Sequence, residues 1–436
     1  MYYGAMYGGS TTSILLNVPG EASSVLTCLD GYAMARAGRA GAALGIAAIG
    51  SFIAGTFSVV MLNLIAEPLA NFAVSFGPPE YFALTFLGLT LVTSLTGKSL
   101  VKGIMSAVFG LLIATIGIDV ISGAGRFTFG QIELMDGIGL IGLIVGLFAI
   151  SEVLENIEDP LKQVFITTKM RFRDMFPTRD EWRRVLPVIG RSSIIGFFVG
   201  VLPGAGATIS SFIAYATEKR LSKHPELYGT GIIEGVAAPE TANNGSTGGA
   251  MVTLLTLGIP GGGSTAVMLG ALLLHGLRPG PLLFHNQPDF VWGFIASMYI
   301  GNIMLIILNM PLIQMWVALL RVPYNILMPG IVSLSAIGVL ATDNSITDVW
   351  IMVGAGILGY LMRKVGFPLA PLVLGYILGP MVENSLRQSL VISHGDLLVF
   401  FTRPISTVLI TLGLLSLFTP IIRGVWKKAG SPEAEY

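Results

Sequence analysis

Residues 241–261 read TANNGSTGGAMVTLLTLGIPG, and residues 8–20 read GGSTTSILLNVPG. From their Gly-Gly pairs onward the two blocks align with a gap of one residue, and both end in Pro-Gly. Each block is followed by small residues and then by a turn of the form Arg-x-Gly, at Arg36 and at Arg278. Because hydrophobic segments broken at corresponding places in two halves are typical of membrane proteins built from repeats, the sequence predicts two related halves.

The composition places the chain in a lipid bilayer. Hydrophobic residues make up 53% of the 436 residues, charged residues make up 11%, and the mean hydropathy is +0.77. So little polar surface does not cover a soluble globule of this size. A net charge of zero gives no polyanion-binding surface, so we expect no nucleic-acid partner. The single cysteine, Cys28, excludes an intramolecular disulfide.

Apolar runs recur along the whole chain, which a cleaved signal peptide would not explain. They predict an all-α polytopic membrane protein with roughly 9 to 12 membrane segments, because about 20 residues of helix cross the hydrocarbon core. Runs long enough to span lie at 43–66, 81–95, 103–121, 138–153, 187–202, 291–320, 326–340, 350–361 and 397–422. Shorter runs bounded by Gly or Pro lie at 205–217, 248–258, 264–274 and 368–378. We expect the shorter runs to form half-helices or re-entrant hairpins whose broken backbone faces protein or a polar cavity.

Basic residues predict the orientation in the membrane, because Lys and Arg resist translocation. They crowd one central loop, at Lys162, Lys169, Arg171, Arg173, Arg179, Arg183 and Arg184. We expect this loop and the C-terminus to be cytoplasmic. The chain then divides into a first half at 1–158, a basic connection at 159–187, a second half at 188–429 and a polar tail at 430–436, which we expect to be disordered.

The Pro-Gly tips carry the predicted chemistry. Proline stops a helix and glycine lets the chain reverse, which leaves helix N-termini whose N–H groups suit a carboxylate. We expect the substrate to lie between the Pro19-Gly20 and Pro260-Gly261 tips. The candidate substrate-binding residues are Ser10, Thr11, Asn17, Pro19, Gly20, Gly204, Gly206, Asn243, Asn244, Ser246, Thr247, Pro260 and Gly261. Asn17, Asn243 and Thr247 are also candidate ligands of Na⁺ as a coupling ion, since their side-chain oxygens are hard donors. No other cofactor is expected.

Each of these features also has a simpler structural interpretation. Scattered small residues such as Gly41 and Gly45, or Gly196 and Gly200, are more typical of close helix packing. The block 241–249 has too many polar groups for packing alone, so we favour a binding site there. Glu152 and Glu155 are more typical of a solvated helix end than of proton coupling. For Glu240, contact with an ion and a place on a loop surface both remain open.

Two other functional classes compete with transport. An intramembrane hydrolase would use Ser246 and His275, yet the sequence shows neither an oriented base nor an oxyanion partner. A channel would need a continuous polar pore lining, whereas the polar residues here concentrate at the predicted hairpin tips. We therefore predict no catalytic residues and no enzyme activity.

The same motifs carry a family resemblance over nearly the whole chain. They are residues 3–21, 200–207 and 239–261, and the stretch from Leu378-Gly379-Pro380 to Arg403-Pro404. In these stretches the chain resembles the large membrane subunit of the tripartite tricarboxylate transporters. The resemblance implies a secondary transporter of carboxylates in the bacterial inner membrane, driven by an ion gradient. It also implies two partners, a small four-helix membrane subunit and a periplasmic solute-binding protein. Family members carry an earlier Leu-Pro-Gly block like that at Leu202, so we expect a preceding helix pair to be absent from this sequence.

Overall fold

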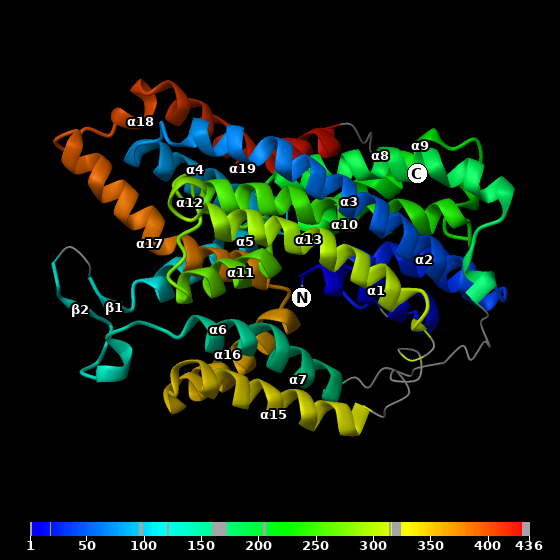
Figure 1. Cartoon of the computed structure of the whole chain (residues 1–436). Coiled ribbons are helices and arrows are strands. Elements are labelled where there is room, and N and C mark those ends of the chain that lie inside the picture. Colours follow the sequence, from blue (N-terminus) through cyan, green and yellow to red (C-terminus); the bar gives the residue numbers. More distant parts are fainter. Residues whose placement is uncertain are drawn as a thin grey trace, which may run out of the picture. The chain divides into compact units, whose positions relative to one another are not determined.

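The computed structural model describes residues 2–17, 19–95, 99–119, 122–158, 172–203, 206–313, 315 and 324–429. Helices make up nearly all of the ordered elements, which confirms the prediction of an all-α fold (Figure 1). The strands of these ranges are β1 (Gly117–Ile118) and β2 (Gly125–Arg126), which pair antiparallel with Gly117 opposite Arg126. Six helices of the described ranges are long and apolar enough to cross a membrane, at Ala40–Ala73, Leu140–Glu158, Arg179–Val201, Pro288–Asn309, Ile346–Lys364 and Leu369–Ile392.

The chain packs as two compact units. Unit 1 comprises Met1–Val74, Leu161–Thr265 and His275–Leu327, and unit 2 comprises Ser75–Pro160, Ala266–Leu274 and Met328–Tyr436. Each unit takes chain from both sides of the basic connection, so the compact units and the predicted sequence halves are different divisions of the chain. The repeat halves stay a prediction, and residues 159–171 of the basic connection and the whole tail 430–436 lie outside the described residues.

Unit 1 is built around α10, which runs from Ile233 to Leu257. Every residue of this helix from Ile233 to Thr256 is buried, so it has no polar face to present to solvent. It packs against α3, α8 and α9 (Figure 1). The other elements of this unit are α1 (Tyr2–Leu16), η1 (Ala22–Ser24), α2 (Val25–Arg36), α3 (Ala40–Ala73), η4 (Phe172–Met175), α8 (Arg179–Val201), α9 (Gly206–Leu221), η5 (Pro225–Leu227), the start of α11 (Gly263–Leu274), α12 (Leu283–Asn286) and α13 (Pro288–Asn309).

Scattered glycines let the helices of unit 1 approach closely. A Cβ at Gly45 of α3 would fall on the carbonyl oxygen of Met175, and one at Gly200 of α8 would fall on the carbonyl oxygen of Ser246. Side chains at these positions would force the helices apart. The packing interpretation of these glycines is therefore confirmed.

Unit 2 centres on α17 (Leu369–Ile392), which packs against α4 (Pro78–Leu95) and α5 (Leu100–Ala114). Its apolar core contains Leu372, Val373 and Leu378, each no more than 1% exposed. The other elements are η2 (Ile132–Leu134), α6 (Leu140–Val145), the π-helical turn η3 (Gly146–Ile150), α7 (Ser151–Glu158), α15 (Tyr324–Asp343), which begins in unit 1, α16 (Ile346–Lys364), α18 (Val399–Thr402) and α19 (Pro404–Ala429).

Several predicted segment boundaries are wrong. The run 248–258 is not a half-helix but the end of the continuous α10, and the run 368–378 is the start of the 24-residue α17. Both helices contain a proline, Pro239 and Pro380, and continue through it. One missing N–H does not break a helix that neighbouring helices hold in place. The run 103–121 is helical only as far as Ala114, after which the chain forms the β1–β2 hairpin.

Candidate functional site

The polar block of the sequence lies in the middle of α10, inside unit 1. Asn243, Asn244, Ser246 and Thr247 are all 0% exposed. Ser246 Oγ donates to the Asn243 carbonyl at 2.7 Å and Thr247 Oγ1 donates to the Asn244 carbonyl at 2.6 Å. These hydroxyl hydrogens are thus used within the helix, while the hydroxyl oxygens keep lone pairs that can accept a hydrogen bond or bind a cation.

A hydrogen-bond network crosses α10 and joins it to two neighbouring helices. Thr27 of α2 donates to Glu240 Oε1, and Asn243 Nδ2 lies 3.3 Å from Glu240 Oε2. Asn244 Nδ2 lies 2.6 Å from Asn243 Oδ1 and 2.7 Å from Ser51 Oγ of α3. All five side chains are at most 1% exposed. Of the two interpretations of Glu240, a loop surface is wrong, because this carboxylate is buried inside a helix bundle.

The first predicted tip follows α1 and leads into α2. Gly20 packs directly against α1, where a Cβ would come within 2.5 Å of the Gly9 Cα. Asn17 has a left-handed φ of 58° and is exposed, as are Pro19 and Gly20. Glu21 accepts a hydrogen bond from Ser23 Oγ at 2.5 Å. This tip is therefore fixed by small residues and short-range hydrogen bonds.

Helix α1 brings the first hairpin to the polar block. Its Ser10 and Thr11 are buried, and Ser10 Oγ donates to the Tyr7 carbonyl at 2.7 Å. At its start, the side chains of Tyr2 and Tyr3 interact with Ser246 and Thr247 of α10 respectively. The candidate residues of α1 and α10 thus belong to adjacent helices of one unit.

The second tip lies where α9 and α11 begin. Gly206, at a φ of 56°, would place a Cβ 3.5 Å from the Gly261 carbonyl oxygen, and a Cβ on Gly262 would lie 3.9 Å from the Gly206 Cα. Pro260 and Gly261 are buried, unlike Pro19 and Gly20 of the first tip. Two helix N-termini therefore start side by side, and Gly204 lies outside the described residues. A shared cradle between the two Pro-Gly tips stays a prediction.

The residues of the competing hydrolase do not form a dyad. Ser246 gives its hydroxyl hydrogen to the Asn243 carbonyl rather than to a histidine, and His275 is exposed. Within the described ranges, His, Cys, Asp and Glu form no group of three that could hold a metal ion. Glu152 and Glu155 are largely exposed, and both pair with Arg363; the distance from the Arg363 guanidinium to Glu155 Oε2 is 3.1 Å. This is expected of a solvated helix end.

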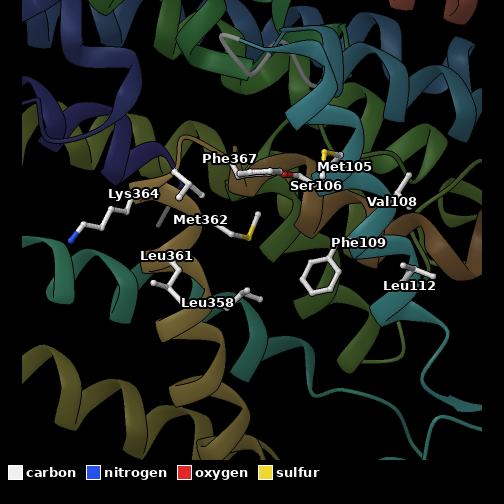
Figure 2. Close-up of a pocket in the computed structure, with 11 residues that line it drawn as sticks. Met105, Ser106, Val108, Phe109, Leu112, Leu358, Leu361, Met362, Lys364 and Phe367 are labelled. Atoms are coloured by element: carbon white, nitrogen blue, oxygen red, sulfur yellow. The ribbon is translucent and has the colours of Figure 1, made fainter.

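Unit 2 contains an apolar groove of about 540 Å³ beside α5 and α16 (Figure 2). Its lining includes Phe109, Leu358 and Met362, and Lys364 is the charged residue among the described lining residues. In Figure 2 the Lys364 side chain extends away from Phe109. Its ammonium group pairs with Glu158 at 2.6 Å. A carboxylate would be desolvated in this groove without a free cation to compensate it, so the groove is not the site.

Sequence reasoning missed Thr27, which bonds to Glu240, and Ser51, which bonds to Asn244 of the polar block. Each lies in a helix of mostly small and apolar residues, and the neighbouring sequence gives no signal of function. Their sequence separations from Glu240 and Asn244, 213 and 193 residues, put them beyond any motif.

The model of the tripartite tricarboxylate transporter TctA family matches residues 1–374. The chain belongs to this family. It is 46% identical over 429 residues to a protein of Agrobacterium vitis named "Uncharacterized 52.8 kDa protein in TAR-I ttuC' 3'region", covering 98% of this chain and 85% of that protein. It is also 46% identical over 233 residues to a second protein of that organism, "Uncharacterized protein in TAR-II ttuC' 3'region", covering 53% of this chain and 96% of that protein. No solved structure matches.

Membership of the TctA family confirms the resemblance found in the sequence and makes this chain the membrane subunit of a transporter. The buried polar block of α10 and the paired helix starts at Gly206 and Gly263 are thus features of a TctA-family transport subunit.

Proposed function

We propose that this chain is the large membrane subunit of an ion-coupled secondary transporter for tricarboxylates or related carboxylates. It takes its substrate from a periplasmic solute-binding protein and works with a small four-helix membrane subunit. It lies in the bacterial inner membrane with its central loop and C-terminus cytoplasmic, as the basic residues predict. Na⁺ is the proposed coupling ion.

The observation that carries this proposal is a buried polar interior without fixed positive charge. Helix α10 contains no Lys or Arg, yet its middle turns bury amide and hydroxyl groups completely. Beside it, Gly206 at the start of α9 lies close to Gly261 and Gly262, which precede α11. This closeness supports a site to which both helix N-termini offer N–H groups and partial positive charge. Such a site binds an anion through dipoles and avoids the cost of about 2.5–3.5 kcal/mol or more for a fixed charge at mid-membrane.

The test is uptake of labelled citrate in cells that express the chain with its two proposed partners. Gly261→Val is expected to abolish uptake, because a Cβ there would lie 2.9 Å from the Ala250 Cβ and would push the second tip away from α10. Gly293→Val in α13 is the matched control, since a Cβ at that position meets nothing within 4 Å. Membrane amounts of both variants are compared by immunoblot.

Three results decide the proposal. Saturable uptake that needs all three proteins and is lost in Gly261→Val alone supports it. Equal uptake in both variants removes the second tip from the site. If uptake rises linearly with citrate concentration and does not depend on any ion gradient, the protein is a channel.

A further inference from the structure

We infer that Glu240, Thr241 and Asn244 of α10, together with Ser51 of α3, form the site of the coupling Na⁺ ion. The inference rests on the proposed ion-coupled transport and gives it a definite location. The proposed ligands differ from those expected from the sequence, which were Asn17, Asn243 and Thr247; of these, Asn17 is exposed.

Glu240 differs from most other buried acids in how its charge is compensated. Five other carboxylates of the described residues, each at most 7% exposed, pair with an arginine, namely Glu80 with Arg403, Asp119 with Arg387, Glu181 with Arg39, Glu218 with Arg191 and Glu234 with Arg184. Glu240 is 1% exposed, and the described residues place only the neutral donors Thr27 and Asn243 on its carboxylate. A buried carboxylate needs a compensating cation, a proton or a full set of hydrogen-bond donors, and the two neutral donors on Glu240 are not such a set.

Two buried oxygens close to Glu240 along α10 have no hydrogen-bond partner in the described part of the chain. Thr241 Oγ1 and Asn244 Oδ1 are both on fully buried side chains, and neither has a partner among the described residues. Buried polar atoms are nearly always satisfied, so two such atoms within one helical turn point to a missing ligand.

The orientation of the Asn244 amide is fixed by its surroundings. Its Nδ2 lies near three acceptors, Ser51 Oγ at 2.7 Å, the Glu240 carbonyl at 3.2 Å and Asn243 Oδ1 at 2.6 Å. A flipped amide would put Oδ1 against the two carbonyl-type oxygens, which repel it. Oδ1 is therefore the atom left free, and an oxygen without a donor is a ligand for a cation.

Gly50 and Ser51 of α3 lie beside the turn of α10 that carries the proposed ligands. Ser51 Oγ donates to the Glu240 carbonyl at 3.2 Å, so Ser51 lies beside the turn of α10 that carries Glu240, Thr241 and Asn244. The neighbouring Gly50 faces Thr241, and a Cβ there would come within 2.5 Å of Thr241 Oγ1. Glycine at this position leaves room beside the free hydroxyl oxygen.

The chemistry of the proposed ligands indicates which ion binds. All proposed ligands are oxygens, which excludes the softer metals that prefer nitrogen or sulfur. One carboxylate among neutral oxygens balances a single positive charge, whereas divalent ions in all-protein sites take several carboxylates. The site thus suits Na⁺.

The experiment measures Na⁺ binding to the purified full chain without carboxylate or partner proteins. Thermal unfolding is followed while choline is replaced by Na⁺ at constant ionic strength, because a ligand of the folded state raises the unfolding temperature. We expect a saturable rise with Na⁺ and none with K⁺. Glu240→Gln and Thr241→Val are each expected to raise the half-saturating Na⁺ concentration about tenfold or more, a loss of one good ligand.

Glu234→Gln is the matched control, because it removes a buried carboxylate from the same helix that already pairs with Arg184 at 3.1 Å. Its Na⁺ response is expected to match that of the native chain. Thr241→Val keeps the side-chain shape, so it reports on the site even if Glu240→Gln fails to fold.

The inference is overturned if Na⁺ stabilises the native chain no more than choline does, or if Glu240→Gln and Thr241→Val respond to Na⁺ like the native chain. It is also overturned if Glu240→Gln removes a pH dependence of stability while Na⁺ has no effect, because the cation is then a proton. Na⁺ binding without any carboxylate uptake would reject the proposed function and leave the site standing. Na⁺-independent uptake together with no Na⁺ effect on stability would reject the site and the proposed Na⁺ coupling, and it would leave carboxylate transport standing.

Discussion

At the scale of single residues, Asp30 of α2 shows how unit 1 satisfies a buried charge. Its carboxylate is 0% exposed and accepts hydrogen bonds from the backbone N–H groups of Gly229, Gly231 and Ile232. The Tyr215 hydroxyl donates a fourth at 2.9 Å. This full set of donors fixes the loop before α10 and contrasts with the two donors on Glu240.

Replacing Asp30 tests this role. In Asp30→Asn an NH₂ group faces backbone N–H donors, so we expect the free energy of unfolding to fall by about 1.5–3 kcal/mol, the value of hydrogen bonds to a charged group. Tyr215→Phe removes one donor and should cost less. Thermal unfolding of the purified variants measures both, and an unchanged unfolding temperature in Asp30→Asn would show that the loop does not depend on this carboxylate.

At the scale of elements, the close approach of α8 and α10 decides where the polar block lies. A Cβ on Gly196 of α8 would come within 2.9 Å of the Ala242 Cα, besides touching the carbonyl of that residue. The backbones of the two helices are therefore in direct contact, and the turn with Asn243 and Asn244 is held at a fixed depth inside unit 1.

Gly196→Val should separate the two helices. We expect a loss of stability of about 1–3 kcal/mol from overpacking, together with reduced citrate uptake because the polar block shifts. Gly190→Val on the same helix is the control, as a Cβ there meets nothing within 4 Å. Heating the detergent-solubilised variants and measuring the monodisperse fraction tests the difference. Similar curves for the two variants would contradict direct backbone contact at Gly196.

At the scale of the whole molecule, the distribution of charge sets the proposed topology. Acidic and basic residues meet in unit 2 near the β1–β2 hairpin, where Arg126 pairs with Glu383 at 2.8 Å and Arg387 pairs with Asp119 at 3.1 Å. Basic residues dominate the central loop and the C-terminus. The positive-inside rule places the hairpin opposite these two regions.

Reporter fusions test this topology. Green fluorescent protein fused after Tyr436 should fluoresce, since it folds in the cytoplasm, and alkaline phosphatase inserted at the exposed Phe129 should be active, since it needs the periplasm. When the two reporters are exchanged, we expect neither fluorescence nor phosphatase activity. Active phosphatase at the C-terminus would invert the proposed orientation and assign the basic loop to the periplasm.

The sequence by itself determined the membrane class and the family resemblance, because hydrophobicity, charge and motifs are local properties of the chain. It also indicated the polar block 241–249 as a site. Only the tertiary structure decided that Pro239 and Pro380 do not break their helices and that Gly248 belongs to a continuous α10. It alone brought Thr27 to Glu240 and Ser51 to Asn244, and it left Thr241 Oγ1 and Asn244 Oδ1 without a partner among the described residues. Those facts depend on which distant helices surround α10. Neighbouring helices supply the packing that holds a helix together at a proline, and they decide whether a buried oxygen has a hydrogen-bond donor.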